Sequence, residues 1–216
     1  SLAGQVYAFG VACIAEATAI RSWGLTEPCI IFQGVHQAQE WIQASELGFE
    51  VVLHQQYQLD WLLKHPLKEP VKVWAKFNTG MNRLGFSMDE FETVIKDLKK
   101  CPWVDDKLGV MTHFACADEL EHPLNQHQKQ EWLKITQNWD GYISACNSAA
   151  IWQFHSLCGT HIRPGLALYG VSPFFDVHAN ALHLKPVMRF KSAIMAIHSI
   201  EAGESIGYGA TFVTRR

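Results

Sequence analysis

Residues 71–86 read VKVWAKFNTGMNRLGF, a mostly apolar run that ends at Lys76 and continues into a polar loop that contains Arg83. An apolar run without regular alternation is typical of a strand in a sheet that is covered on both faces. In α/β barrels, the reactive groups follow the carboxyl ends of the strands. The stretch therefore predicts a buried strand with two candidate functional side chains, Lys76 and Arg83, at its carboxyl end.

The same pattern recurs along the chain. Strand–helix repetition at this spacing predicts an α/β fold with a parallel sheet. Helical patterns occupy 14–23, 38–47, 58–64, 88–100 and 125–139. The strand-like segments are VYAFGVA (6–12), CIIFQ (29–33), FEVVLH (49–54), VKVWAKF (71–77), KLGVMTHF (107–114), YISAC (142–146) and HIRPG (161–165). These seven units are one fewer than a TIM-type (β/α)8 barrel needs, so we expect such a barrel without its first βα unit.

The pattern changes after residue 180. Residues 183–214 alternate strand-like runs with the turn EAGES (201–205), which predicts the start of a β-domain. Two or three strands are marginal alone. We therefore expect a barrel domain over 1–180 and an incomplete C-terminal β-domain over 181–216, in a chain truncated at both ends.

Composition excludes several classes of function. The 216 residues are 48% hydrophobic and 18% charged with a formal net charge of −3, which fits a globular enzyme domain without the basic footprint of a nucleic-acid or membrane-surface binder. No apolar run approaches the roughly 20 residues of a transmembrane helix. The start SLAGQVYAFG lacks the pattern of a secretory signal. Six cysteines without a C-x-x-C pair predict a reduced, cytoplasmic protein.

Polar residues follow the predicted strands in a consistent way. Each has a structural alternative: Lys76 could pair with a carboxylate, Asn147 and Ser148 could cap the helix AAIWQF, and His113 could be a hydrogen-bonded core histidine. Their common position at one end of the barrel favours a functional site. The set is Lys76, Asn78, Thr79, Arg83, His113, Asp118, Glu119, Asn147, Ser148, Arg163 and Gly165.

Two stretches predict an anion site. CNSAA places Ser148 at a helix start, where free N–H groups attract negative charge, and RPGLALYG places Gly165 at a close backbone approach after the last strand. Loops at this position often form the phosphate site of a barrel, so we expect a phosphorylated ligand. No metal is expected, because the sequence lacks H-E-x-x-H, and neither a P-loop nor a G-x-S-x-G elbow is present.

Five motifs in order resemble the alanine racemase family. They are KFNTGMNRLGF (76–86), THFACADE (112–119), NSAA (147–150), RPGLALYGVSP (163–173) and GYGATF (207–212), and YAFGVACIAEATAIR (7–21) is similar to the family's second βα unit. The resemblance implies a cytoplasmic homodimer that carries pyridoxal 5′-phosphate. Its members interconvert L-alanine and D-alanine by two-base proton transfer and supply D-alanine for the peptidoglycan of the cell wall.

The resemblance also implies which residues hold the cofactor. Ser148 matches the serine that binds the phosphate, beside Asn147 and the backbone N–H groups near Gly165 and Leu166. Arg163 matches the arginine that faces the pyridine nitrogen. Because arginine stays protonated, it cannot give that nitrogen a proton, so the ring is a weaker electron sink.

The remaining matches concern catalysis. Tyr208 matches the tyrosine base, which reaches the site from the partner subunit, and His113 matches its hydrogen-bonded neighbour, which is linked onward to Arg163. Arg83 matches the arginine near the cofactor's phenolic oxygen and the substrate carboxylate, to which its fork of donors is suited. Lys76 matches a lysine that is carbamylated in many members and orients that arginine.

Departures from the family pattern limit what the chain itself is expected to do. A motif like VKANAYGHG, whose lysine forms the Schiff base, is absent, and none of the twelve lysines is a substitute. We therefore assign the cofactor to the full-length enzyme and expect this chain to be inactive. Two alternatives are a non-enzymatic pyridoxal-phosphate-binding barrel, which GYGATF disfavours, and another amino-acid racemase or a decarboxylase of the same fold. Arg163 disfavours the decarboxylase.

Overall fold

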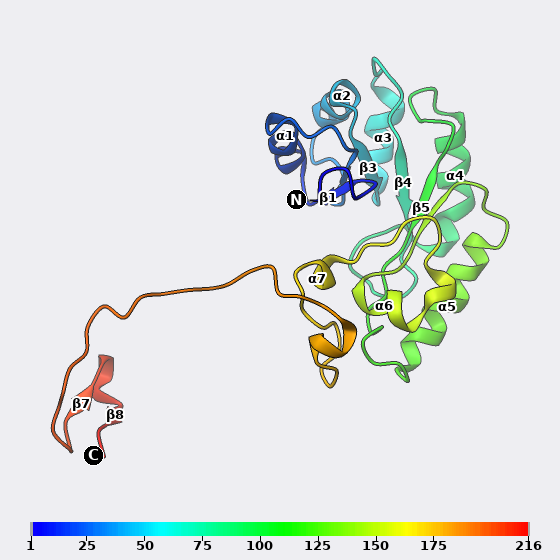
Figure 1. Cartoon of the computed structure of the whole chain (residues 1–216). Helices are drawn as coiled ribbons and strands as arrows, with labels where there is room; N and C mark the ends of the chain where they lie inside the picture. The colour runs from blue at the N-terminus through cyan, green and yellow to red at the C-terminus, as the bar shows by residue number, and fades with distance from the viewer. Residues whose placement is uncertain (1, 216) are drawn as a thin grey trace. The chain divides into compact units, whose positions relative to one another are not determined.

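A computed structural model describes residues 2–215 and divides the chain into two compact units, one that reaches Lys185 and one that begins at Pro186. In the first unit, six parallel strands follow one another across a curled sheet in the order β1-β2-β3-β4-β5-β6 (Figure 1). The strands are β1 (Phe9–Val11), β2 (Cys29–Ile31), β3 (Glu50–Leu53), β4 (Val73–Lys76), β5 (Gly109–Met111) and β6 (Tyr142–Ser144). Sequential order with every pair parallel is the arrangement of a (β/α)8 barrel, of which this sheet is a part.

Helices follow the strands, and the first five lie where the sequence predicts them. They are α1 (Ile14–Ser22), α2 (Ala38–Leu47), α3 (Gln56–Lys64), α4 (Phe91–Lys100), α5 (Pro123–Thr136), α6 (Ser148–Gln153) and α7 (Gly165–Leu168), with short 3-10 turns at η1 (Met88–Glu90), η2 (His155–Leu157) and η3 (Ala179–Leu182). The start of α4 shows why boundaries fall where they do. Ser87 and Glu90 form a capping box ahead of it, with Glu90 accepting from the Ser87 N–H at 2.7 Å.

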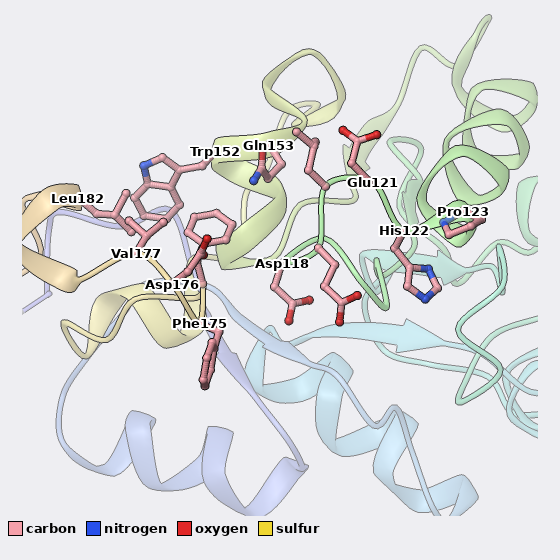
Figure 2. Close-up of a pocket in the computed structure, with 13 residues that line it drawn as sticks. Asp118, Glu121, His122, Pro123, Trp152, Gln153, Phe175, Asp176, Val177 and Leu182 are labelled. Carbon is pink, nitrogen blue, oxygen red and sulfur yellow. The ribbon is translucent and has the colours of Figure 1, made fainter.

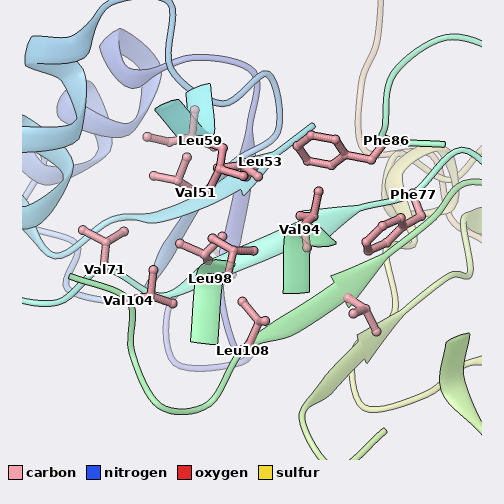
Figure 3. Close-up of a cluster of buried hydrophobic side chains, with 14 of the residues drawn as sticks. Val51, Leu53, Leu59, Val71, Phe77, Phe86, Val94, Leu98, Val104 and Leu108 are labelled. Carbon is pink, nitrogen blue, oxygen red and sulfur yellow. The ribbon is translucent and has the colours of Figure 1, made fainter. Parts of the chain in front are cut away.

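The two faces of the sheet bury different side chains. Successive residues of a strand point to opposite faces. Val73 and Ala75 therefore belong to the large core that packs against the helices, part of which Figure 3 shows, whereas Trp74 belongs to a small inner cluster. That inner cluster also contains Ile30, Val52 and Met111. Lys72 and Lys76 share the period of Trp74 along β4 and hence its inner face.

The seventh predicted strand, HIRPG (161–165), is wrong. Residues 160–164 are an irregular segment beside β6, where the N–H groups of Thr160 and His161 both donate to the Ile143 carbonyl at 3.0 Å. The bridge between Ser144 and Gly159 is antiparallel, so this segment cannot extend the parallel ladder. Pro164 also lacks an N–H donor, and α7 begins directly after it.

The second unit contains one short hairpin among its described residues. Strands β7 (Ser205–Ile206) and β8 (Phe212–Val213) pair antiparallel around the turn η4 (Tyr208–Ala210). The expected turn in EAGES is present at 202–203, but the strand-like runs between 184 and 200 form no strands. Without pairing partners a β-prone run stays irregular, because its backbone gains no ladder hydrogen bonds.

Candidate functional site

Lys76 ends β4 with its side chain inside the curled sheet. Only 7% of the residue is exposed, and its amine has no hydrogen bond or ion pair among the described residues. Burial, together with the nearby positive charges of Arg163 and Arg83, lowers the pKa of Lys76 to about 8. The alternative that Lys76 is half of an ordinary ion pair is therefore wrong.

The loop after Lys76 folds back on the end of β4. The Phe86 N–H donates to the Lys76 carbonyl at 2.9 Å, and the Asn78 side chain accepts from the Gly80 and Asn82 N–H groups. Gly85 has a φ of +126°, and a Cβ there would lie 2.7 Å from the Asn78 nitrogen. This tight return leaves Arg83 exposed, on a slot that Lys76 and His113 also line.

His113 follows β5 and contacts two other predicted site residues. Its Nδ1 lies 3.3 Å from Arg163 Nη2, and its Nε2 lies 3.4 Å from Asn147 Nδ2. Burial lowers the pKa of His113 to about 3, with contributions from the charges of Arg163, Lys76 and Arg83. The imidazole is therefore neutral at physiological pH, with Nδ1 accepting from Arg163.

Arg163 is the centre of this cluster. Its Nη2 donates to the carbonyls of Thr112 at 2.6 Å and Ala145 at 3.0 Å, and Nη1 donates to the Ser144 hydroxyl. Burial lowers the pKa of Arg163 to about 10, so the guanidinium remains charged at neutral pH. These bonds join the carboxyl ends of β5 and β6 and fix the guanidinium in one orientation.

The predicted phosphate residues also lie together. Asn147 is the N-cap of α6 and accepts from the Ala150 N–H at 3.1 Å, while the Ser148 hydroxyl accepts from the Ala167 N–H of α7 at 3.1 Å. This bond places the starts of α6 and α7 next to each other, so the N–H of Leu166 lies at the same end as those of α6. The expected close approach at Gly165 is wrong as far as the chain's own atoms are concerned, because a Cβ there would meet no atom within 4 Å.

Two predicted residues line a separate groove of the first unit, and a third belongs to the second unit. Asp118 and Glu119 line an open groove with Trp152 and Asp176 (Figure 2), whereas Lys76 and His113 line a different pocket. Tyr208 belongs to the second unit, where its side chain is fully exposed.

Two buried polar side chains that contact the predicted site residues were not predicted from the sequence. Ser144 is buried, accepts from Arg163 and donates to the His161 carbonyl at 2.8 Å. Gln128, in the middle of α5, bonds to the loops after both β4 and β5. Ser144 lies near the end of the predicted strand YISAC (142–146), which is a weak indication of a site residue. Nothing in the sequence around Gln128 indicates a contact with the site.

The cluster fits two of the three parts of the cofactor that the resemblance implies. The Ser148 hydroxyl and the adjoining helix starts suit a phosphate, and the charged, fixed guanidinium of Arg163 suits a ring nitrogen that accepts a hydrogen bond. The lysine for covalent attachment is not matched. Lys76 is the only buried lysine in residues 2–215, and it belongs to the motif KFNTGMNRLGF and not to the motif that carries the Schiff-base lysine of the family.

Metal binding and membrane insertion receive no support from the described part of the chain. No group of three or more His, Cys, Asp or Glu side chains within residues 2–215 is arranged to hold a metal ion. Over the same range, every helix is too short or too polar to span a bilayer.

A family model described as "Alanine racemase, N-terminal domain" matches residues 1–173. An alanine racemase of Legionella pneumophila (strain Corby) is 49% identical over 211 residues, which cover 98% of this chain and 59% of the relative. One of Psychrobacter sp. (strain PRwf-1) is 42% identical over 216 residues, covering 96% of this chain and 57% of the relative. The chain thus spans less than two thirds of the length of these relatives.

Solved structures show the same similarity. The structure of alanine racemase from Acinetobacter baumannii superposes with a TM-score of 0.87 at 44% identity, covering 98% of this chain and 60% of that chain. The biosynthetic alanine racemase from Pseudomonas aeruginosa superposes with a TM-score of 0.92 at 33% identity, covering 100% of this chain and 60% of that chain. The close superposition on both structures supports the assignment of this curled parallel sheet as part of a (β/α)8 barrel.

Proposed function

The chain belongs to the alanine racemase family, and on that premise we propose that it is part of a pyridoxal 5′-phosphate-dependent enzyme that interconverts L-alanine and D-alanine. The observation that carries the proposal is that Arg163, His113 and Lys76 lie together at the carboxyl ends of β4–β6. The Ser148 hydroxyl and the adjoining starts of α6 and α7 lie at the same end. D-Alanine made in this way would supply peptidoglycan. All six cysteines are free, which supports a cytoplasmic setting.

We assign the cofactor's phosphate to Ser148, Asn147 and the backbone N–H groups near Gly165 and Leu166, and its ring nitrogen to Arg163. When bound, the cofactor supplies an electron sink that acidifies the α-proton of the substrate amino acid. Arg163 limits that sink, because its guanidinium keeps its protons at neutral pH and therefore does not protonate the ring nitrogen. A restrained sink favours return of the proton over side reactions such as transamination.

Arg83 is proposed to bind the substrate carboxylate, since its exposed guanidinium has no partner among the described residues and can bind both oxygens. The lowered pKa of Lys76 supports its carbamylation: a fraction of the amine is neutral at pH 7 and can add CO2, releasing one proton. The resulting anion would replace the positive charge of Lys76 with a negative one near Arg83 and Arg163, and so turn repulsion into attraction.

Tyr208 is proposed to exchange the proton on one face of the substrate, from the partner subunit of a homodimer. His113 is the neutral acceptor between that tyrosine and Arg163, because its Nδ1 accepts from Arg163. The base for the opposite face is assigned to a lysine that this sequence does not contain, so the 216-residue chain alone is proposed to be inactive.

A chimera tests the proposal. Residues 1–216 are joined to the flanking segments of the Legionella pneumophila relative, and racemisation of L-alanine is followed with added pyridoxal 5′-phosphate. We expect turnover by the chimera, none by the chain alone, and a loss of about 100-fold in kcat for Tyr208→Phe. Tyr169→Phe, which alters an exposed tyrosine of the first unit, is the matched control and should leave kcat unchanged.

Three results would contradict this proposal. Full activity of the Tyr208→Phe chimera would remove the tyrosine from catalysis. A folded chimera that binds the cofactor without racemising alanine would favour the non-enzymatic carrier, and turnover of another amino acid only would favour a different racemase.

A further inference from the structure

One fully buried amide of the first unit is the Gln128 side chain on α5. It has no exposed surface, and all of its hydrogen bonds go to loops that follow strands. Its Nε2 donates to the Thr79 hydroxyl at 3.1 Å and to the His113 carbonyl at 2.9 Å, and its Oε1 accepts from the Ala115 N–H at 2.9 Å. One side chain therefore joins the loop after β4 to the loop after β5.

Residues 113–115 depend on this connection. They belong to neither strand nor helix, so their backbone groups have no ladder or helical partners. Gln128 bonds to the first and third residues of the segment, and Asn147 donates to the Phe114 carbonyl at 3.1 Å. Two amide side chains thus set where the His113 ring meets Arg163.

The loop that carries Arg83 is held through a chain of hydroxyl groups. Thr112 donates its only hydroxyl proton to the Phe77 carbonyl at 3.0 Å, so Thr79 must donate to Thr112 across their 2.7 Å contact. Thr79 in turn accepts from Gln128. The bonds therefore run in one direction, from Gln128 through Thr79 and Thr112 to Phe77, and hydrogen bonds aligned in this way strengthen one another.

We propose that Gln128 is a positioning residue, which holds His113 against Arg163 and fixes the loop of Arg83 beside it. Its consequence for catalysis rests on the proposed function, whereas its effect on His113 is a property of the chain alone. A failure of the positioning role would therefore show in the titration of His113, whereas a failure of the proposed function would show only in activity.

The test on the 216-residue chain compares three variants of α5. Gln128→Met removes the amide at nearly constant length. Asn125→Leu removes an equally buried amide, which donates instead to the carbonyls of Cys116 and Glu119. Gln130→Leu alters an exposed glutamine of the same helix. Both amide variants remove buried hydrogen bonds, but only Gln128→Met acts on the segment that carries His113.

The readout is the titration of His113 by NMR of selectively labelled histidine, with its signal assigned by its loss in His113→Gln. In the native chain, burial and the charges of Arg163, Lys76 and Arg83 lower the pKa of His113 to about 3, so the ring should stay neutral between pH 5 and 8. In Gln128→Met the released ring should regain solvent, and its pKa should rise by at least about one unit. Asn125→Leu and Gln130→Leu should leave it unchanged.

Several outcomes overturn the proposal. A folded Gln128→Met chain with an unchanged His113 titration does so, and so does an equal shift in Asn125→Leu, which would indicate general loosening. If Gln128→Met does not fold, Gln128→Asn takes its place, since it keeps the amide one methylene too short and should shift the titration in the same direction. In the chimera, Gln128→Met should lower kcat by about tenfold or more.

Discussion

Lys72 and Lys76 lie four residues apart on the same face of β4, and their surroundings are opposite. Lys72 contacts Glu50 Oε1 at 3.1 Å and the Tyr7 hydroxyl at 2.8 Å. Burial alone would lower the pKa of Lys72, but the hydrogen bond that its ammonium donates to Tyr7 and the charge of Glu50 outweigh burial and raise the pKa. Among the described residues, the charged neighbours of Lys76 are Arg163 and Arg83, and its pKa falls.

The amino end of the sheet is a closed polar network around Glu50. One oxygen of that carboxylate accepts from Lys72, and the other accepts from Trp74 Nε1 at 2.7 Å. The Tyr142 and Tyr7 rings lie 4.9 and 5.6 Å from the Lys72 ammonium. Each charge therefore has partners, which is the pattern of an element that stabilises the fold.

The carboxyl end gathers cations without a carboxylate. Arg163, Arg83 and Lys76 repel one another, and His113 stays neutral among them. Uncompensated buried charge costs stability, and such costs are concentrated at functional sites. Two lysines four residues apart thus differ in their surroundings, and the proposed function assigns an anion-binding role only to the carboxyl end, where barrel architecture places functional groups.

The largest effect should come from breaking the network at the amino end. Glu50→Gln leaves the Lys72 ammonium without its counter-charge and should lower the free energy of unfolding by about 3 kcal/mol, measured by urea denaturation at pH 7. Glu46→Gln, at an exposed position of α2, should change it by less than about 0.5 kcal/mol. A loss for Glu50→Gln no larger than for Glu46→Gln would mean that the pair contributes little.

A smaller effect of opposite sign should follow at the carboxyl end. Lys76→Met removes a buried, unpaired cation and should raise the free energy of unfolding by about 2 kcal/mol at pH 7 in buffer depleted of CO2. Lys72→Met is the matched control and should lower it, because Glu50 loses its partner.

The pH dependence of Lys76→Met follows from the pKa of the amine, which is 10.5 in the unfolded chain and about 8 in the folded one. The unfolded chain binds more protons between these values, so the native chain loses stability as the pH falls from 10.5 to 8 and not below. The advantage of Lys76→Met should be full below pH 8 and vanish toward pH 10.5. An advantage that is independent of pH would point to packing instead of charge.

Much of this contrast could be predicted from the sequence and part of it could not. Strand–helix periodicity predicted the parallel sheet, and the residues after each strand predicted that Lys76, His113 and Arg163 meet. Lys72 was not singled out, because its partner Glu50 lies 22 residues away on β3 and nothing local indicates the pairing. The strand at 161–165 was mispredicted because the short segment HIRPG does not indicate its own pairing direction. The antiparallel bridge between Ser144 and Gly159 is a tertiary contact that the sequence does not reveal.

The contacts of Gln128 could not be predicted from the sequence for a related reason. Gln128 sits at a helix-interior position of α5, and the periodicity of a helix says only that such a residue is buried. Its role depends on which loops face that helix, a tertiary property. Tyr208 illustrates the opposite case, since its motif could be recognised while its role remains a proposal about a partner subunit.

The smallest effect sharpens the comparison by weakening the network at the amino end without removing a charge. Tyr7→Phe deletes the hydroxyl that accepts from Lys72 and donates to Glu50 Oε1 at 3.2 Å, and it should lower the free energy of unfolding by about 1 kcal/mol. Tyr57→Phe, on the exposed side of α3, is the control and should be neutral. In the Glu50→Gln background the cost of Tyr7→Phe should shrink, because the hydroxyl then bridges no ion pair. Equal costs in both backgrounds would show that the hydroxyl acts on Lys72 alone, and the amino end would then be a set of separate contacts and not a network.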